Sequence, residues 1–476
     1  MNEVTDPTWL SLLPALVTIA LAFATRQVIP ALFAGIVTGS LVLFAGSGEA
    51  ADLNFISRFF LPAIGSHKYA QILLIYLWSL GGLIGIWEKT GGARHFAEQV
   101  GLRFSKSRRG SLFFVWLLGC VFHQGGTVST VLTGSTAKPV TDRFRVSHEE
   151  LSYVVDSTSS PIATILPFNA WPIYVGGLAA GTIALIPDDA AGFAFFLRAL
   201  PFNFYAIFAV LSTLLFALEL LPWVPGPMAR ARRRTKDGGP LDRPGASPML
   251  VGAPSPTPED HSDYRPHLVD FLVPLGLLLL ISALPVTLGL GSFVNEAFMT
   301  AVLSAMLIAR LRGMNLATII SGLVDGCAKM TIGAIVLGLA VTIAEVAKSL
   351  DTAGYLVGVA GGALPPVALP ALLMLLCMVI AFATGTSWGT YAVVVPIALP
   401  LAWALQADPS YLAICLGAVV GGGVFGDQCS PISDTTILSS MFSGCDLMDH
   451  VRTQLPLALA AATLAALCST LAAAAL

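Results

Sequence analysis

Two short polar stretches carry the groups in this chain that could bind an ion. They read GDQCSPISDTT at 426–436 and DSTSSP at 156–161. Each combines a carboxylate and hydroxyls with a proline, which lacks an amide proton, interrupts a helix and frees backbone carbonyls. Hard cations such as Na⁺ take oxygen ligands of this kind. A carboxylate withdrawn from water also binds a proton more readily, so one such site could hold Na⁺ or H⁺ but not both.

The rest of the chain is strongly apolar. Of its 476 residues, 55% are hydrophobic and 11% are charged, against about 25% charged in a typical soluble domain. Apolar runs such as 28–46 and 451–476 approach or exceed the roughly 20 residues that cross a bilayer. We therefore predict an all-α, multi-pass membrane protein in contact with lipid, with roughly 11–13 membrane segments. The formal net charge of −3 gives no support for a nucleic-acid partner.

In this setting the acidic residues of the two stretches need an explanation. A carboxylate at the centre of a membrane helix costs roughly 2.5–3.5 kcal/mol on insertion scales. We favour an ion-binding role for Asp427, Asp434 and Asp156. The alternative for each is a helix cap at the membrane surface.

Basic residues predict the orientation, because cytoplasmic loops carry an excess of Lys and Arg. The stretch 88–110 is basic, and 224–267 contains RARRRTK among many Pro and Gly residues. Both are predicted to be cytoplasmic, with the N-terminus outside and 224–267 acting as a flexible linker. This linker separates a first repeat, 1–223, from a second repeat, 268–476.

The charge pattern also predicts a re-entrant hairpin in each repeat. A simple crossing by 111–140 would carry Arg143 and Arg145 outside, so we expect a hairpin that turns at Gly125–Gly126 and returns. The equivalent segment is 366–406, which turns near Gly385 and Gly389. Non-helical backbone at membrane depth survives only where protein or a water-filled cavity shields it. The tips of both hairpins should therefore line a cavity.

The predicted organisation is then the same in both repeats. Scaffold helices come first, and a hairpin and a broken helix follow within 111–190 and within 366–445. Since the second repeat begins inside and the first begins outside, the two are predicted to be inverted repeats, an arrangement typical of secondary transporters with a site at the membrane midplane. The residues predicted to line the substrate cavity are His123, Gln124, Gly125, Gly126, Thr127, Ser129, Thr384, Gly385, Thr386, Ser387 and Asn169, with capping or packing as the alternative for Asn169.

Two longer stretches resemble a known family. TAKPVTDRFRVSHEELSYVVDSTSSPIA at 136–163 and GDQCSPISDTTILSS at 426–440 are similar to the paired motifs of NhaC-type Na⁺/H⁺ antiporters, within the ion transporter superfamily. The resemblance implies an elevator-type transporter that forms a homodimer through a fixed scaffold. Together, the resemblance and the composition of the two stretches give Asp156, Ser157, Thr158, Ser160, Asp427, Ser430, Ser433, Asp434 and Thr435 as candidates for cation or proton binding.

We therefore expect a Na⁺/H⁺ antiporter of the bacterial inner membrane, with Na⁺ held by Asp427, Ser430 and Asp434 and with no cofactor beyond the coupling ions Na⁺ and H⁺. The alternative within transport is a Na⁺- or H⁺-coupled exchanger of a small organic acid, such as malate or lactate, or of another metabolite. An enzyme finds little support, because the chain has only seven histidines and no HExxH motif. Paired hairpins and broken helices favour alternating access over a channel.

Overall fold

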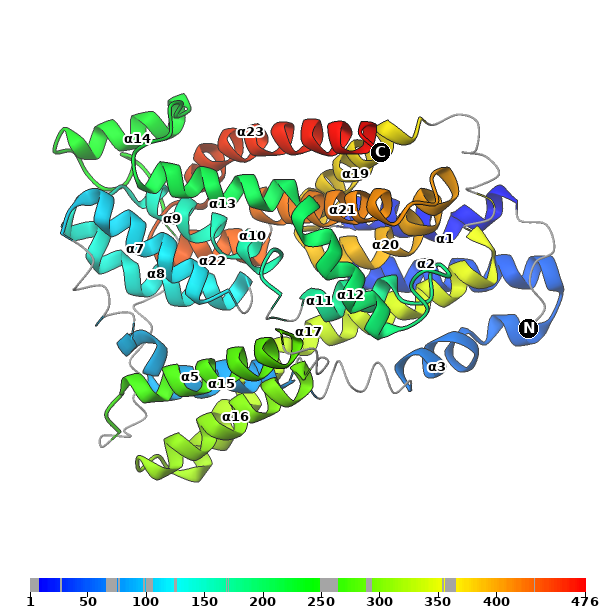
Figure 1. Ribbon diagram of the computed structural model, residues 1–476, viewed down its shortest axis with the longest axis horizontal. Coiled ribbons are helices and arrows are strands. Elements are labelled where there is room, and N and C mark those ends of the chain that lie inside the picture. The colour runs from blue at the N-terminus through cyan, green and yellow to red at the C-terminus, as the bar shows by residue number, and fades with distance from the viewer. Residues whose placement is uncertain are drawn as a thin grey trace.

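All regular structure in the described part of the chain is helical, as predicted (Figure 1). The computed structural model describes residues 8–25, 28–65, 75, 78–96, 99, 106–123, 126–167, 169, 171–248, 264–287, 293–352, 355, 365–431 and 433–476. Single-turn helices lie at Trp9–Leu12, Ala50–Leu53, Ile56–Phe60, Leu200–Phe202 and Pro366–Ala368.

One group of helices, here called the α17 group, comes from the beginning of each repeat. Its longest member, α17, packs against both α5 and α2. The backbones of α5 and α17 touch, since a Cβ at Gly326 would lie 1.8 Å from the carbonyl oxygen of Gly81. The members are α1 (Leu13–Thr25), α2 (Val28–Ser47), α3 (Leu61–Ile64), α5 (Trp78–Thr90), α15 (Leu268–Thr287), α16 (Val294–Leu311) and α17 (Leu316–Ser349).

A second group, here called the break group, interleaves helices of both repeats. The cyan α8 and α9 of the first repeat pack against the orange α22 of the second (Figure 1). The members are α7 (Arg108–Val121), α8 (Gly126–Arg143), α9 (His148–Ser157), α10 (Ser160–Ala163), α11 (Trp171–Ala179), α12 (Asp189–Ala199), α13 (Phe204–Ala217), α19 (Leu369–Thr384), α20 (Ser387–Leu405), α21 (Pro409–Cys429), α22 (Asp434–Ser443) and α23 (Leu447–Ala474).

Several helices are suited to a bilayer. In the described residues, four are long and apolar enough to cross one, and α12 with α13, bent by 50°, makes a possible fifth. The four are Ile29–Ser47, Ser387–Leu405, Pro409–Cys429 and Leu447–Ala474. They agree with a multi-pass membrane protein, while the larger predicted number of segments stays a prediction.

Each of the two predicted hairpins corresponds to a pair of helices, while their re-entry into the membrane stays a prediction. The first consists of α7 and α8, and its two ends lie together, because the Arg108 guanidinium donates a hydrogen bond to the carbonyl of Arg145. The second consists of α19 and α20, which are separated by Gly385 in the left-handed conformation with φ 70°. Gly389, also expected at this turn, lies inside α20 instead.

Both polar motifs interrupt a helix, as predicted. In the first motif α9 ends at Ser157 and α10 begins at Ser160, and in the second α21 ends at Cys429 and α22 begins at Asp434. Each half on either side of the linker therefore has the order helix pair, helix, break, helix, while their relation as inverted repeats stays a prediction.

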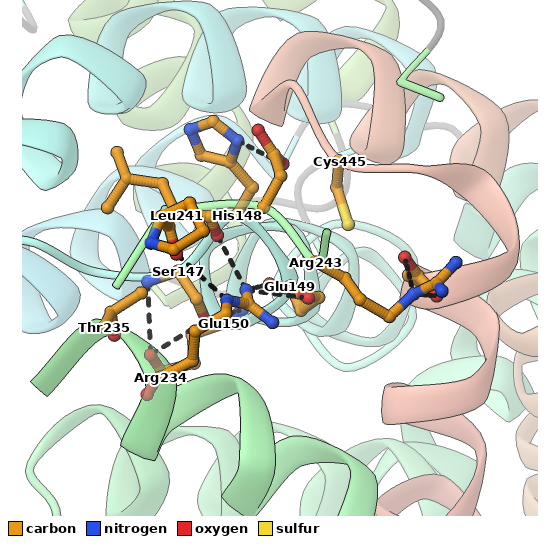
Figure 2. A network of polar contacts seen from close by, with 12 residues as sticks. Ser147, His148, Glu149, Glu150, Arg234, Thr235, Leu241, Arg243 and Cys445 are labelled. Carbon is orange, nitrogen blue, oxygen red and sulfur yellow. Dashed lines mark hydrogen bonds and ion pairs between the residues drawn. The ribbon is translucent and has the colours of Figure 1, made fainter. Parts of the chain in front are cut away.

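The linker is not flexible where the structure describes it, so that part of the prediction is wrong for 226–248. Residues Gly226–Lys236 form helix α14, which packs against α9 and α23. Figure 2 shows the reason: the Arg234 guanidinium donates to the Glu149 carboxylate at 2.7 Å. In the loop that follows, Arg243 donates to Asp449 at 2.8 Å.

A fully buried carboxylate explains why α14 folds onto α9. Glu150 is 0% exposed, and a buried charge is tolerated only when it is paired. Arg232 of α14 donates to it at 2.7 Å, and Arg108 of α7 is a second partner. The basic run that predicted a loop thus completes an ion-pair network.

Candidate functional site

The two broken helices meet at their breaks. Gln428, in the last turn of α21, donates from Nε2 to the Oγ of Ser157, the last residue of α9, at 2.7 Å. The Gln428 side-chain carbonyl accepts from the Tyr205 hydroxyl at 2.6 Å. The two motifs predicted to bind ions therefore form one buried region.

One cluster in this region surrounds Asp427, whose side chain is 5% exposed. Its Oδ2 accepts from Ser387 Oγ at 2.9 Å, and its Oδ1 accepts from Ser433 Oγ at 2.5 Å. Thr435 Oγ1 lies 3.1 Å from Ser433 Oγ. We call these four residues the Asp427 cluster. They combine a carboxylate with three hydroxyl oxygens.

Two helix N-termini hold this cluster in place. Ser387 is the first residue of α20, directly after the second hairpin turns, and Ser433 precedes the first residue of α22. The partial positive charge at a helix N-terminus stabilises a nearby carboxylate. Ser430, in the break itself, donates to the Phe382 carbonyl of α19 at 2.7 Å and so fixes the break against the hairpin.

The tip of the first hairpin lies against both breaks. A Cβ at Gly126, the first residue of α8, would lie 2.7 Å from Thr435 Cγ2 and 2.9 Å from Ser160 Oγ. Only a glycine allows this approach. The tips of both predicted hairpins thus reach the polar region.

A second cluster surrounds Asp156, which is 0% exposed. Its Oδ2 accepts from Gln454 Nε2 at 2.8 Å and lies 3.0 Å from His450 Nε2. The imidazole also contacts the hydroxyls of Ser152, through Nδ1, and of Ser439, which is 3.1 Å from Nε2. We call Asp156 and His450 the His450–Asp156 pair.

The sequence interpretation missed His450, Gln454 and Gln428. A signal was present, because His450 and Gln454 are four positions apart and so share one face of α23. Gln454 also joins the two clusters, since its Nε2 donates both to Asp156 and to the backbone carbonyl of Gln428, the neighbour of Asp427.

Other predicted residues have backbone partners. Thr158 Oγ1 donates to the Val154 carbonyl at 2.7 Å. Asn169 donates to the Ala163 carbonyl at 2.7 Å and accepts from the Trp171 amide, which fits the capping alternative. His123 is buried in the turn after α7, with Nδ1 3.0 Å from the Cys120 carbonyl.

The remaining lining residues are only partly described. Ser129 is buried in α8, and Thr386 is half-buried before α20. Gln124, Gly125 and the side chains of Thr127, Thr384 and Asp434 lie outside the described residues. Among the described residues, no three His, Cys, Asp or Glu side chains come together as a metal centre.

The arrangement of the helices matches that of a solved transporter structure. The fold matches the crystal structure of the Alcanivorax borkumensis YdaH transporter with a TM-score of 0.55, over 96% of this chain and 98% of that one, at 14% sequence identity. At this identity the likeness shows the fold alone.

The chain belongs to the Na⁺/H⁺ antiporter family, whose sequence profile matches residues 162–472. This confirms the resemblance to NhaC-type antiporters. An uncharacterized protein of Haemophilus influenzae is 32% identical over 95% of this chain and 88% of its own length. The malate-2H⁺/Na⁺-lactate antiporter of Bacillus subtilis is 29% identical over 42% of each chain.

Proposed function

We propose that the protein exchanges Na⁺ for H⁺ and that Na⁺ binds in the Asp427 cluster. The observation that carries this proposal is a nearly fully buried carboxylate, at a helix break, whose two oxygens face hydroxyls from two other segments. Hydroxyl oxygens that donate to Asp427 can rotate and present lone pairs to a cation. Ser430 and Asp434, adjacent in the same break, complete the proposed ligand set.

Charge supports a cation at this place. A carboxylate removed from water carries a desolvation penalty, and a monovalent cation bound beside it offsets that penalty. Sodium takes oxygen ligands, so a site made of carboxylates and hydroxyls suits it better than it suits a metal that needs nitrogen or sulfur.

Alternating access is proposed from the two hairpins. Both tips contact the polar region, Gly126 from the first repeat and Ser387 from the second. If the repeats are inverted, opening one tip or the other exposes the site to opposite sides of the membrane. We propose that the break group carries the site at the midplane and moves as an elevator against the α17 group. In this arrangement the α17 group provides the dimer contact in the bacterial inner membrane, with the linker cytoplasmic.

A small organic acid is the second candidate substrate. The N-termini of α8, α20 and α22 come together at the polar region, and their partial charges suit a substrate carboxylate. The relationship to the Bacillus subtilis malate-2H⁺/Na⁺-lactate antiporter supports this candidate.

Flux measurements decide between the two candidates. The protein is reconstituted in vesicles that contain a pH-sensitive dye, a pH gradient is imposed, and Na⁺, Li⁺, K⁺, malate or lactate is added. We expect Na⁺ to dissipate the gradient with wild-type protein and not with Asp427→Asn. Asp325→Asn, which removes a half-exposed carboxylate paired with Lys89 on α5, is the matched control. Dissipation by an organic acid alone would favour the second candidate, and no response to any solute would overturn both.

A further inference from the structure

We propose that the His450–Asp156 pair holds the transported proton, at a site separate from the Asp427 cluster. The inference deepens the proposed function and rests on it. In this arrangement Na⁺ and H⁺ do not compete for one carboxylate. Each ion has its own site, and both sites are able to be occupied.

The first argument is the burial of the pair. Both side chains are 0% exposed, and His450 Nε2 lies 3.0 Å from Asp156 Oδ2. A lone carboxylate in this place would be costly, whereas a protonated imidazole next to it makes a neutral pair. Proton uptake therefore removes a net buried charge.

The second argument is that both protonation states of His450 find partners. A neutral ring with its hydrogen on Nε2 donates to Asp156, and its Nδ1 accepts from the Ser152 hydroxyl. When a proton binds to Nδ1, the new N–H donates to the same hydroxyl oxygen, because a serine hydroxyl rotates between donor and acceptor. The site can gain or lose a proton without leaving a ring nitrogen unpaired.

The third argument is that the pair has unused hydrogen-bonding capacity. Asp156 Oδ1 and Gln454 Oε1 are buried and have no hydrogen-bond partner among the residues that the structure describes. Such atoms are uncommon in a site with a purely structural role, since each unpaired group is destabilising. They indicate a region in which partners change during the working cycle.

The groups that face the pair from neighbouring elements include one imidazole, that of His450 itself. The titratable side chains near Asp156 are a thiol and a phenol, those of Cys429 and Tyr205. Cys445 lies beside Ser152. Asp449, the residue before His450 on α23, is held by Arg243 of the linker. Asp427 is connected to the pair through Gln454 and Gln428, and through Ser439 and Thr436.

Gln454 gives the two sites a physical connection. The same amide group contacts Asp156 Oδ2 and the carbonyl of Gln428 at the end of α21. A change in the net charge of the His450–Asp156 pair therefore alters the hydrogen bond that holds the helix end carrying Asp427. This connection allows the proton to affect Na⁺ release without sharing its ligand.

The test uses the full-length protein, with sodium binding and Na⁺-driven proton flux measured separately across roughly pH 5–8. His450→Gln keeps a donor toward Asp156 but has no titratable group. We expect this variant to retain sodium binding and to lose the pH dependence of binding, while proton flux falls by about a hundredfold. Asp427→Asn should lose sodium binding instead. His267→Gln, at the start of α15, is the histidine control and should match wild type.

Two further outcomes keep the proposal testable. Wild-type proton flux and an unchanged pH profile in His450→Gln would overturn it. If that variant does not fold, Ser152→Ala is used in its place. A pH profile of sodium binding shifted to lower pH supports the proposal, because the charged His450 ring has lost its acceptor. An unshifted profile overturns it. If wild type couples protons to an organic acid rather than to Na⁺, the proposed function fails on its own, and the same variants test the proton site with that solute.

Discussion

Gln428 and Ser157 join the two halves of the molecule through one hydrogen bond of 2.7 Å between Nε2 and Oγ. The two residues are 271 positions apart, and each belongs to the last turn of a helix that a polar motif interrupts. The contact makes the two breaks a single structural unit.

We expect Gln428→Leu and Ser157→Ala to be coupled energetically. Each variant alone leaves a buried polar partner unpaired, and the double variant leaves none at this contact, so the coupling energy should be about 0.5–3 kcal/mol. The measurement is a double-mutant cycle on unfolding in detergent. As a control, Ser304→Ala on α16 combined with Ser157→Ala should give additive effects on stability. Additivity between Gln428→Leu and Ser157→Ala would show that the two motifs are independent.

The approach of the first hairpin tip predicts a strong effect of Gly126→Ala. The added methyl would lie 2.7 Å from Thr435 Cγ2, so the tip must move, which costs about 1–3 kcal/mol. Transport should slow, and the unfolding temperature should fall. Gly276→Ala in α15 adds a methyl with nothing within 4 Å, so it should change neither the transport rate nor the unfolding temperature. Equal effects at both positions would contradict the packing at the tip.

Removing hydroxyls from the Asp427 cluster should weaken sodium binding. We expect Ser387→Ala and Ser433→Ala each to weaken the free energy of sodium binding by about 1–2 kcal/mol, because each variant loses one proposed ligand and one hydrogen bond to Asp427. Sodium-dependent thermal stabilisation measures the change. Ser321→Ala, which removes a hydroxyl bonded to Asp325 on α17, is the control. Unchanged sodium affinity in both cluster variants would place the cation elsewhere.

The linker contact predicts that two neighbouring arginines differ in their effect on stability. Arg232→Ala leaves the buried Glu150 with one partner fewer and should destabilise the protein by about 3 kcal/mol. Arg230→Ala removes an exposed side chain of the same helix and should have little effect. Thermal unfolding of the two variants tests this, and similar values would mean that α14 is not held through Glu150.

His148, at the start of α9, predicts a pH dependence of stability. Burial acts to lower its pKa, but hydrogen bonds with Asp142 and Asp242 outweigh burial and raise the pKa from 6.5 to about 9. The stabilisation is therefore complete below pH 6.5 and is lost as the pH rises through about 9. His148→Gln should be less stable than wild type at low pH and should approach it at high pH. A constant difference in stability between His148→Gln and wild type across this pH range would contradict the pairing of a charged His148 with Asp142 and Asp242.

The sequence was most informative where local chemistry decides the structure. A proline beside small and polar residues ends a helix whatever surrounds it, so the breaks after Ser157 and Cys429 were predictable. The hairpin turn at Gly385 followed in the same way from glycine and from the positions of basic residues.

Long-range pairing was not predictable from these patterns. Asp325 of α17 lies 3.2 Å from Lys89 of α5, because glycines bring the two helices into backbone contact, and no local spacing predicts this ion pair. The pairing of His450 with Asp156 was unpredictable for the same reason. Asp156 lies in the other half of the chain, and no local pattern records that proximity.

The separation between Asp156 and His450 has a consequence for how a cell makes this molecule. A ribosome must add 294 further residues after the aspartate before the histidine exists, which takes roughly 15–60 s at typical elongation rates. Throughout that delay the nascent first half lies in the membrane with Asp156 lacking its imidazole partner. Surveillance proteases should accordingly clear any product whose translation stops before the final helix.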